Sequence, residues 1–150
     1  MSLLETKLSD FRSLSLCLHL AHRLFNKAPH LEHQLRTLLD SSGIKNRVVV
    51  ISACHSGSFI PALATPTTLV ITAARADRTS FGCSDKRRWT YFGDAYFNRA
   101  LRRQTSLAQA FTRAKRRIGR WEAQEKLTPS LPQIAGGETL GPALAAIERQ

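Results

Sequence analysis

Cys54 stands where the chain could present a nucleophilic thiol. It follows the β-branched run at residues 48–51 and precedes three small residues, Ser56, Gly57 and Ser58. The run predicts a strand buried on both faces, so the thiol would lie just past its carboxyl end, where α/β proteins gather catalytic groups. The small residues would let a substrate backbone approach and leave N–H groups for an oxyanion. These features suit a cysteine nucleophile, although the strand and the cysteine alone favour a buried structural cysteine.

The segments on either side of this strand predict an α/β domain with a parallel sheet. Residues 29–43 show a helical pattern that ends at Gly43, a residue suited to a left-handed helix cap. The apolar face of this helix would carry four leucines: Leu31, Leu35, Leu38 and Leu39. Residues 68–74 form a second continuous apolar run, which predicts another buried strand.

The second half of the chain predicts a loop followed by two helices and a short strand. Residues 75–88 are polar and irregular, and we expect them at the same sheet edge as Cys54. Residues 89–103 predict a helix whose inward side chains are Phe92, Tyr96, Phe97 and Leu101. Ser106 would cap a longer helix with an apolar stripe made of Leu107, Ala110, Phe111, Ala114, Ile118 and Trp121. Residues 133–137 predict the last strand.

Length and composition predict one domain with its own core. The chain has 150 residues, of which 43% are hydrophobic. Cys17, Cys54 and Cys83 form no Cys-x-x-Cys pair, which argues against a disulfide framework and a zinc site, and we expect no metal or cofactor. Residues 29–137 would form the domain, between an atypical segment at 1–28, with a short half-buried strand at 14–20, and a tail at 138–150.

The net charge of +11 raises nucleic acid as a possible partner. Ten basic residues lie between positions 87 and 120. No nucleic-acid-binding motif accompanies them, and the nearby aromatic residues recur at the spacing of a helix core, unlike a base-stacking surface. A solvated basic face is therefore favoured, with a basic nucleic-acid-binding module as the alternative.

Several motifs in order resemble the legumain-like cysteine peptidases, family C13, and most of all their bacterial members. They are Val-Val-Val-Ile-Ser-Ala-Cys-His-Ser-Gly-Ser-Phe at 48–59, Leu-Val-Ile-Thr-Ala-Ala-Arg-Ala-Asp-Arg-Thr-Ser-Phe-Gly-Cys at 69–83, Trp-Thr-Tyr-Phe-Gly-Asp at 89–94 and Leu-Thr-Pro-Ser-Leu-Pro-Gln-Ile at 127–134. The resemblance extends from about residue 35 to 137. It implies a three-layer α/β/α caspase-like sandwich with a mostly parallel sheet, truncated at its amino-terminal end.

The resemblance also implies roles for individual residues. Cys54 matches the nucleophile, which attacks a peptide carbonyl, and its backbone N–H would contribute to the oxyanion hole. Asp94 falls where asparaginyl-specific members place an acid that lines the substrate pocket, and Thr79 and Ser80 match the wall of that pocket. Ser52 departs from the eukaryotic pattern, which has an acidic residue at this position, so asparagine preference is not implied.

The catalytic histidine of the family is missing from its expected place. The family carries a His-Gly dipeptide well upstream of the cysteine, and this sequence contains none. His19 and His22 are poor substitutes on position, and His55 would point away from Cys54 if the chain were extended there. The chain therefore looks like the carboxyl-terminal part of such a peptidase, and two alternatives follow: an active cysteine endopeptidase, or an inactive remnant that keeps the fold for binding.

The sequence predicts a cytoplasmic protein, although longer relatives can be membrane-associated. The first ten residues lack the pattern of a signal peptide, and no run of eighteen apolar residues occurs. A peptide or protein substrate is the expected partner. Fewer strands are recognisable than a caspase-like sheet needs, so we expect a homo-oligomer or a missing amino-terminal portion to cover the sheet edge.

Overall fold

The computed structural model describes residues 31–82, 89–103, 106–142 and 144. A three-stranded sheet runs through them in the order β1 (Arg47–Ile51), β2 (Thr68–Thr72), β3 (Gln133–Ala135). β1 is parallel to β2, and β3 is antiparallel to it. The three strands predicted in this part of the chain are confirmed, but the described sheet is mixed. The reason is that the chain reaches β3 from the carboxyl end of β2, where the Arg75 N–H donates to the Ser130 carbonyl at 2.9 Å.

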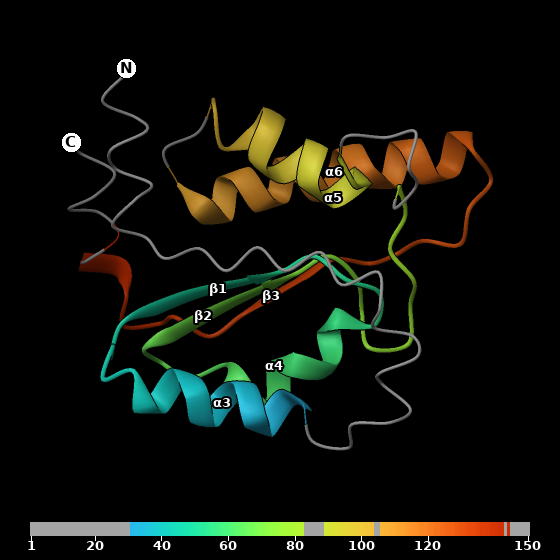
Figure 1. Ribbon diagram of the computed structural model, residues 1–150. Coiled ribbons are helices and arrows are strands. Elements are labelled where there is room, and N and C mark those ends of the chain that lie inside the picture. Colours follow the sequence, from blue (N-terminus) through green and yellow to red (C-terminus); the bar gives the residue numbers. More distant parts are fainter. Residues whose placement is uncertain (1–30, 83–88, 104–105, 143, 145–150) are drawn as a thin grey trace.

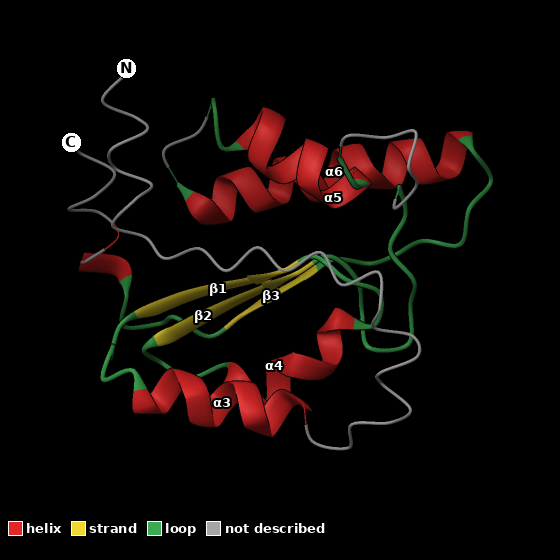
Figure 2. Ribbon diagram, viewed as in Figure 1, coloured by secondary structure: helices red, strands yellow, loops and turns green. Residues whose placement is uncertain are grey.

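Helices cover both faces of the sheet, as Figures 1 and 2 show. One layer consists of α3 (Leu31–Ser41) and α4 (Ile60–Leu63), which follows the short 3₁₀ turn η1 (Ser56–Phe59). The other consists of α5 (Tyr91–Gly93), the π-helical segment η2 (Asp94–Ala100) and α6 (Leu107–Gln124). The predicted α/β class is therefore confirmed.

Alternate side chains of β2 pack into two separate cores, one beneath each helical layer. Ile71 is buried with Phe92 and Tyr96 of the α5–η2 layer. Val70 is buried with Leu63 of α4 on the other face. Because neighbouring residues of a strand point to opposite faces, a strand buried in every residue needs cover on both sides. All five residues of β2 are buried, as the continuous apolar run predicts.

The first helix buries a narrower face than its leucines predict. Leu31, Leu35 and Leu39 pack against the core, whereas 67% of Leu38 is exposed, so the prediction for Leu38 is wrong. At 100° per residue, Leu35 lies at the centre of the buried face and Leu38 about 60° to one side of it. The cap prediction is confirmed, because Gly43 has a φ of 71° and its N–H donates to the Asp40 carbonyl.

The predicted helix at residues 89–103 is present in a modified form. Phe92 and Tyr96 are buried as expected, but the helix widens into η2, where the Leu101 N–H donates to the Tyr96 carbonyl five residues back. Such π-helical segments are rare and often accompany functional sites. Here the wider turn lets the Asp94 carboxylate accept hydrogen bonds from both Asn98 and Arg99.

The long helix α6 has the predicted cap and stripe, together with one buried acid that the sequence did not predict. The Ser106 hydroxyl accepts a hydrogen bond from the Gln109 N–H, and Phe111 and Ile118 are buried. Glu122 is also buried, and its Oε1 accepts the Ser130 N–H at 3.0 Å. This bond holds the loop that leads into β3.

Some predictions concern residues outside those described. These are the strand at 14–20, the atypical segment at 1–28, the histidines His19 and His22, and residues 83–88 of the predicted loop. Beyond the last strand, Leu140 of the predicted tail is buried in the core, and the Thr139 N–H donates to the Pro66 carbonyl. In the described parts of the chain, no helix has the length and apolar character needed to span a bilayer.

Candidate active site

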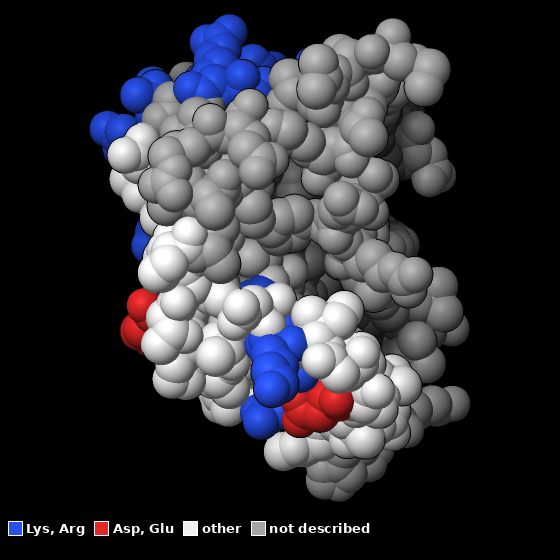
Figure 3. Space-filling view, turned by 90° about the vertical axis from the view of Figure 1, so that its left-hand side faces the viewer, with Lys and Arg blue, Asp and Glu red and all other residues white. Residues whose placement is uncertain are grey.

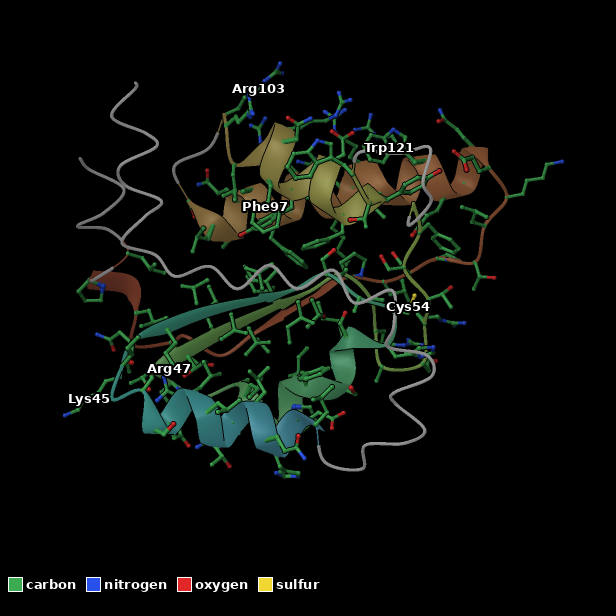
Figure 4. All side chains as sticks on the ribbon, in the orientation of Figure 1. Lys45, Arg47, Cys54, Phe97, Arg103 and Trp121 are labelled. Carbon is green, nitrogen blue, oxygen red and sulfur yellow. The ribbon has the colours of Figure 1, made fainter. Side chains whose placement is uncertain are left out.

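The loops that follow β1 and β2 meet at the edge of the sheet formed by the carboxyl ends of these two parallel strands. The His55 N–H donates to the Arg78 carbonyl at 2.8 Å, and the Ala74 N–H donates to the Ser56 hydroxyl at 3.1 Å. The loop from β2 therefore lies at the same edge as Cys54, as predicted. Figure 4 shows Cys54 at this end of the sheet, away from the end that carries Lys45 and Arg47.

The small residues after Cys54 serve this loop-to-loop packing. A Cβ atom on Gly57 would lie 2.5 Å from the Ala76 backbone nitrogen, and Ser56 is fully buried. The Ser58 N–H donates to the His55 carbonyl at 3.0 Å, so it is not available to an oxyanion. The expectation of open space for a substrate is not met at Ser56 and Gly57, because the loop from β2 packs against both.

The Cys54 thiol is half-buried and contacts the backbone of Ser80. The Ser80 N–H donates to Sγ at 3.3 Å, and Sγ lies 3.5 Å from the Ser80 carbonyl oxygen. Thr79, the neighbouring residue, is exposed. The structure thus brings Ser80 to the cysteine and leaves Thr79 accessible beside it.

Ser52 reaches the opposite helical layer instead of the thiol. It is buried, and its hydroxyl lies 3.2 Å from the Thr90 hydroxyl. Thr90 is the N-cap of α5, because its hydroxyl accepts the Gly93 N–H at 2.9 Å and its carbonyl accepts the Asp94 N–H. A short series of hydrogen bonds between polar groups therefore connects the end of β1 to the start of the segment that carries Asp94.

Asp94 is already engaged by two neighbours. Its carboxylate accepts hydrogen bonds from Asn98 Nδ2 at 2.6 Å and from Arg99 Nε at 2.9 Å. Burial works against ionisation of Asp94, but the Asn98 and Arg99 hydrogen bonds outweigh it, and the pKa of the carboxyl is lowered. The carboxylate is therefore charged at neutral pH.

A cavity of about 430 Å³, called here the aspartate cavity, lies beside this carboxylate. It is lined by Trp89, Thr90, Tyr91, Asp94, Arg99, Trp121 and Glu125. Cys54, Thr79 and Ser80 are not among these residues. The predicted site residues thus fall into two groups, one at the thiol and one at the aspartate cavity, which the Ser52–Thr90 contact joins.

The described histidines are His33 and His55. His55 has a φ of 57°, and its Nδ1 lies 2.9 Å from the Ala76 carbonyl oxygen, so the ring is held by the loop from β2. The backbone at His55 is left-handed and not extended, so the expectation that an extended chain turns His55 away from Cys54 does not apply. His33 is an exposed residue of α3. Among the residues that the structure describes, both hydrogen bonds of the Cys54 Sγ involve Ser80, and neither involves a histidine.

Two residues that shape the site were not singled out from the sequence. Thr90 could have been found, because a threonine just before the first helical residue is a common N-cap. Arg75 could not, since its role depends on how two loops meet: its backbone carbonyl carbon would lie 2.9 Å from a Cβ atom on Gly57, while its guanidinium pairs twice with Asp77, at 2.5 and 2.7 Å. The Arg75 hydrogen bond lowers the pKa of Asp77 to about 2.

Comparison with known protein families gives a match. The model of the Peptidase C13 family matches residues 20–141, a range that includes every described strand and every helix whose bounds are given above. A search of curated proteins found no match.

Proposed function

We propose, because the chain belongs to the Peptidase C13 family, that it is a legumain-like cysteine endopeptidase with Cys54 as its nucleophile. Family membership by itself suggests a cysteine peptidase, and the finer assignment rests on the thiol. The observation that carries it is the position of Sγ: just past β1, half-buried, with the Ser80 N–H directed at it from 3.3 Å. The helices on both faces of the sheet support a caspase-like α/β/α sandwich.

The proposed reaction passes through a thioester. Sγ attacks the peptide carbonyl carbon, the S–C bond forms, the peptide C–N bond breaks, and the departing amine takes up the proton that the thiol gives up. Water then cleaves the thioester and restores the thiol. The Cys54 N–H is the proposed donor to the oxyanion. Ser80 is a positioning residue for sulfur through its backbone.

The proposed substrate pocket lies between the thiol and the aspartate cavity. Thr79 is accessible for contact with a substrate, whereas Ser52 acts indirectly by positioning Thr90. Because Asp94 is paired with Arg99, the two side chains together would contact the substrate side chain. A pocket that presents a carboxylate and a guanidinium together would favour a substrate side chain that both donates and accepts hydrogen bonds.

An inactive protein that retains the fold is the second candidate, and one observation favours it. Within the described ranges, the groups bonded to Sγ are the backbone N–H and carbonyl of Ser80, and neither can act as a general base. Without a base, the thiol proton and the proton for the leaving amine have no carrier.

A mechanism-based probe distinguishes the two candidates. We expect an acyloxymethyl ketone that targets cysteine peptidases to label the wild-type protein at Cys54, as mapped by mass spectrometry of the digest. Cys54→Ala should abolish labelling, and Cys17→Ala is the matched control that should retain it. If the probe does not react while iodoacetamide still alkylates Cys54, the thiol is accessible but not catalytic, and the inactive protein is the correct description.

A further inference from the structure

A second cavity, of about 400 Å³, lies between η2 and the middle of α6. Five arginines line it together with Asn98: Arg99, Arg102, Arg103, Arg113 and Arg117. We call it the arginine cavity. Figure 4 shows blue nitrogen tips gathered around Arg103, and Figure 3 shows Lys and Arg side chains gathered at the upper left of the molecule.

Part of the positive charge of this cavity has no carboxylate partner among the described residues. Of the five arginines, Arg99 pairs with Asp94, and Arg117 lies over the Trp121 ring at 5.9 Å. No ion pair within the described ranges joins Arg102 or Arg113 to a carboxylate, and no acidic residue lines the cavity. Like charges gathered around the arginine cavity repel each other, and an anion bound in the cavity would relieve that repulsion.

We propose that the arginine cavity binds a compact polyanion, namely a small molecule with two or more phosphate groups. Guanidinium groups match phosphate oxygens in pairs, and several converge here from two helices. The volume is in the range of small-molecule sites. No aromatic side chain lines the hollow, so it lacks the stacking surface of single-strand nucleic-acid sites, and its concave shape suits a compact ligand better than a flat membrane.

Arg99 connects this cavity to the aspartate cavity, because it lines both. Its Nε donates to Asp94 at 2.9 Å. A bound polyanion would compete with Asp94 for the Arg99 guanidinium, so occupancy of one cavity would alter the other. Binding of the polyanion does not depend on peptidase activity and stands if that proposal fails.

Calorimetric titration with sodium tripolyphosphate at low ionic strength tests the proposal. Arg102→Gln and Arg113→Gln should each weaken binding roughly tenfold or more, since each removes a charged hydrogen-bond donor. Both residues are exposed, so the variants should fold, as circular dichroism would verify. Arg116→Gln is the matched control: it removes the same charge from an exposed position of the same helix that does not line the cavity, and should leave Kd within about twofold.

Three results would overturn the proposal. One is no detectable binding of tripolyphosphate by the wild-type protein. Another is an equal loss of affinity in Arg116→Gln and the cavity variants, which would indicate diffuse attraction to the net charge. The third is binding of single-stranded DNA or of vesicles rich in anionic lipid that tripolyphosphate does not displace, which would assign the basic surface to a macromolecular partner.

Discussion

At the scale of single residues, the two central side chains of the proposed site, Cys54 and Asp94, both depend on contacts made by a neighbouring segment. Cys54 Sγ receives an N–H from Ser80, whose position depends on the loop from β2. Asp94 depends on η2, because the widened turn brings Asn98 and Arg99 to the same carboxylate. The thiol and the carboxylate are thus each set by backbone geometry in a neighbouring segment, and a change in that geometry should be measurable at the side chain.

Asp94 provides a test of this dependence by its titration. Its folded pKa is lowered, so its charge contributes stability that is present above the unfolded pKa and lost as the pH falls through the folded pKa. Arg99→Gln removes one of the groups that hold the pKa of Asp94 down, so this pKa should rise. Carbon-13 NMR titration of the Asp94 carboxyl measures this. Arg116→Gln should leave the titration unchanged, and an unaltered Asp94 in Arg99→Gln would contradict the assigned role of the pair.

At the scale of elements, local patterns predicted what the backbone forms, and contacts between distant segments decided the rest. The β-branched run of β1, the apolar run of β2 and the Ser106 cap of α6 are each specified within a few residues, and all three are present. The burial of Glu122 was missed because its partner, Ser130, is eight residues away in a loop. The antiparallel direction of β3 was missed because it follows from where that loop enters the sheet.

The same division explains what the sequence indicated about the site. Cys54 could be placed because a strand end is a local feature. The sequence could not show that the space beside Cys54 is filled, because this depends on residues 74–80 folding back over Gly57.

Gly57 tests whether this packing of loops stabilises the fold. Gly57→Ala would place a Cβ atom 2.5 Å from the Ala76 backbone nitrogen and 2.9 Å from the Arg75 carbonyl carbon, and these backbone atoms leave little room to adjust. We expect a loss of about 1–3 kcal/mol in the free energy of unfolding, measured by urea denaturation. Gly119→Ala is the control, because nothing lies within 4 Å of its Cβ position in α6, and alanine there should stabilise by about 0.5–1 kcal/mol. Equal effects of the two substitutions would contradict the packing argument.

At the scale of the whole molecule, the sheet is covered unevenly. All five residues of β2 are buried between its neighbours, whereas four of the five residues of β1 are only half-buried. In the part of the chain that the structure describes, no strand pairs with the outer edge of β1. An unpaired edge presents backbone N–H and carbonyl groups that another strand can use, and natural proteins cover or block such edges.

We therefore predict that the protein forms homo-oligomers through the β1 edge, with an upstream portion of the chain as the alternative cover. The net charge of +11 opposes association of identical copies, and salt screens that repulsion. The mass measured by light scattering should consequently rise with protein concentration, and more steeply at high ionic strength than at low. Contacts made mainly by the arginines would show the opposite salt dependence, because screening weakens attraction between charges. A monodisperse monomer at all salt concentrations would show that the β1 edge is already covered within a single chain.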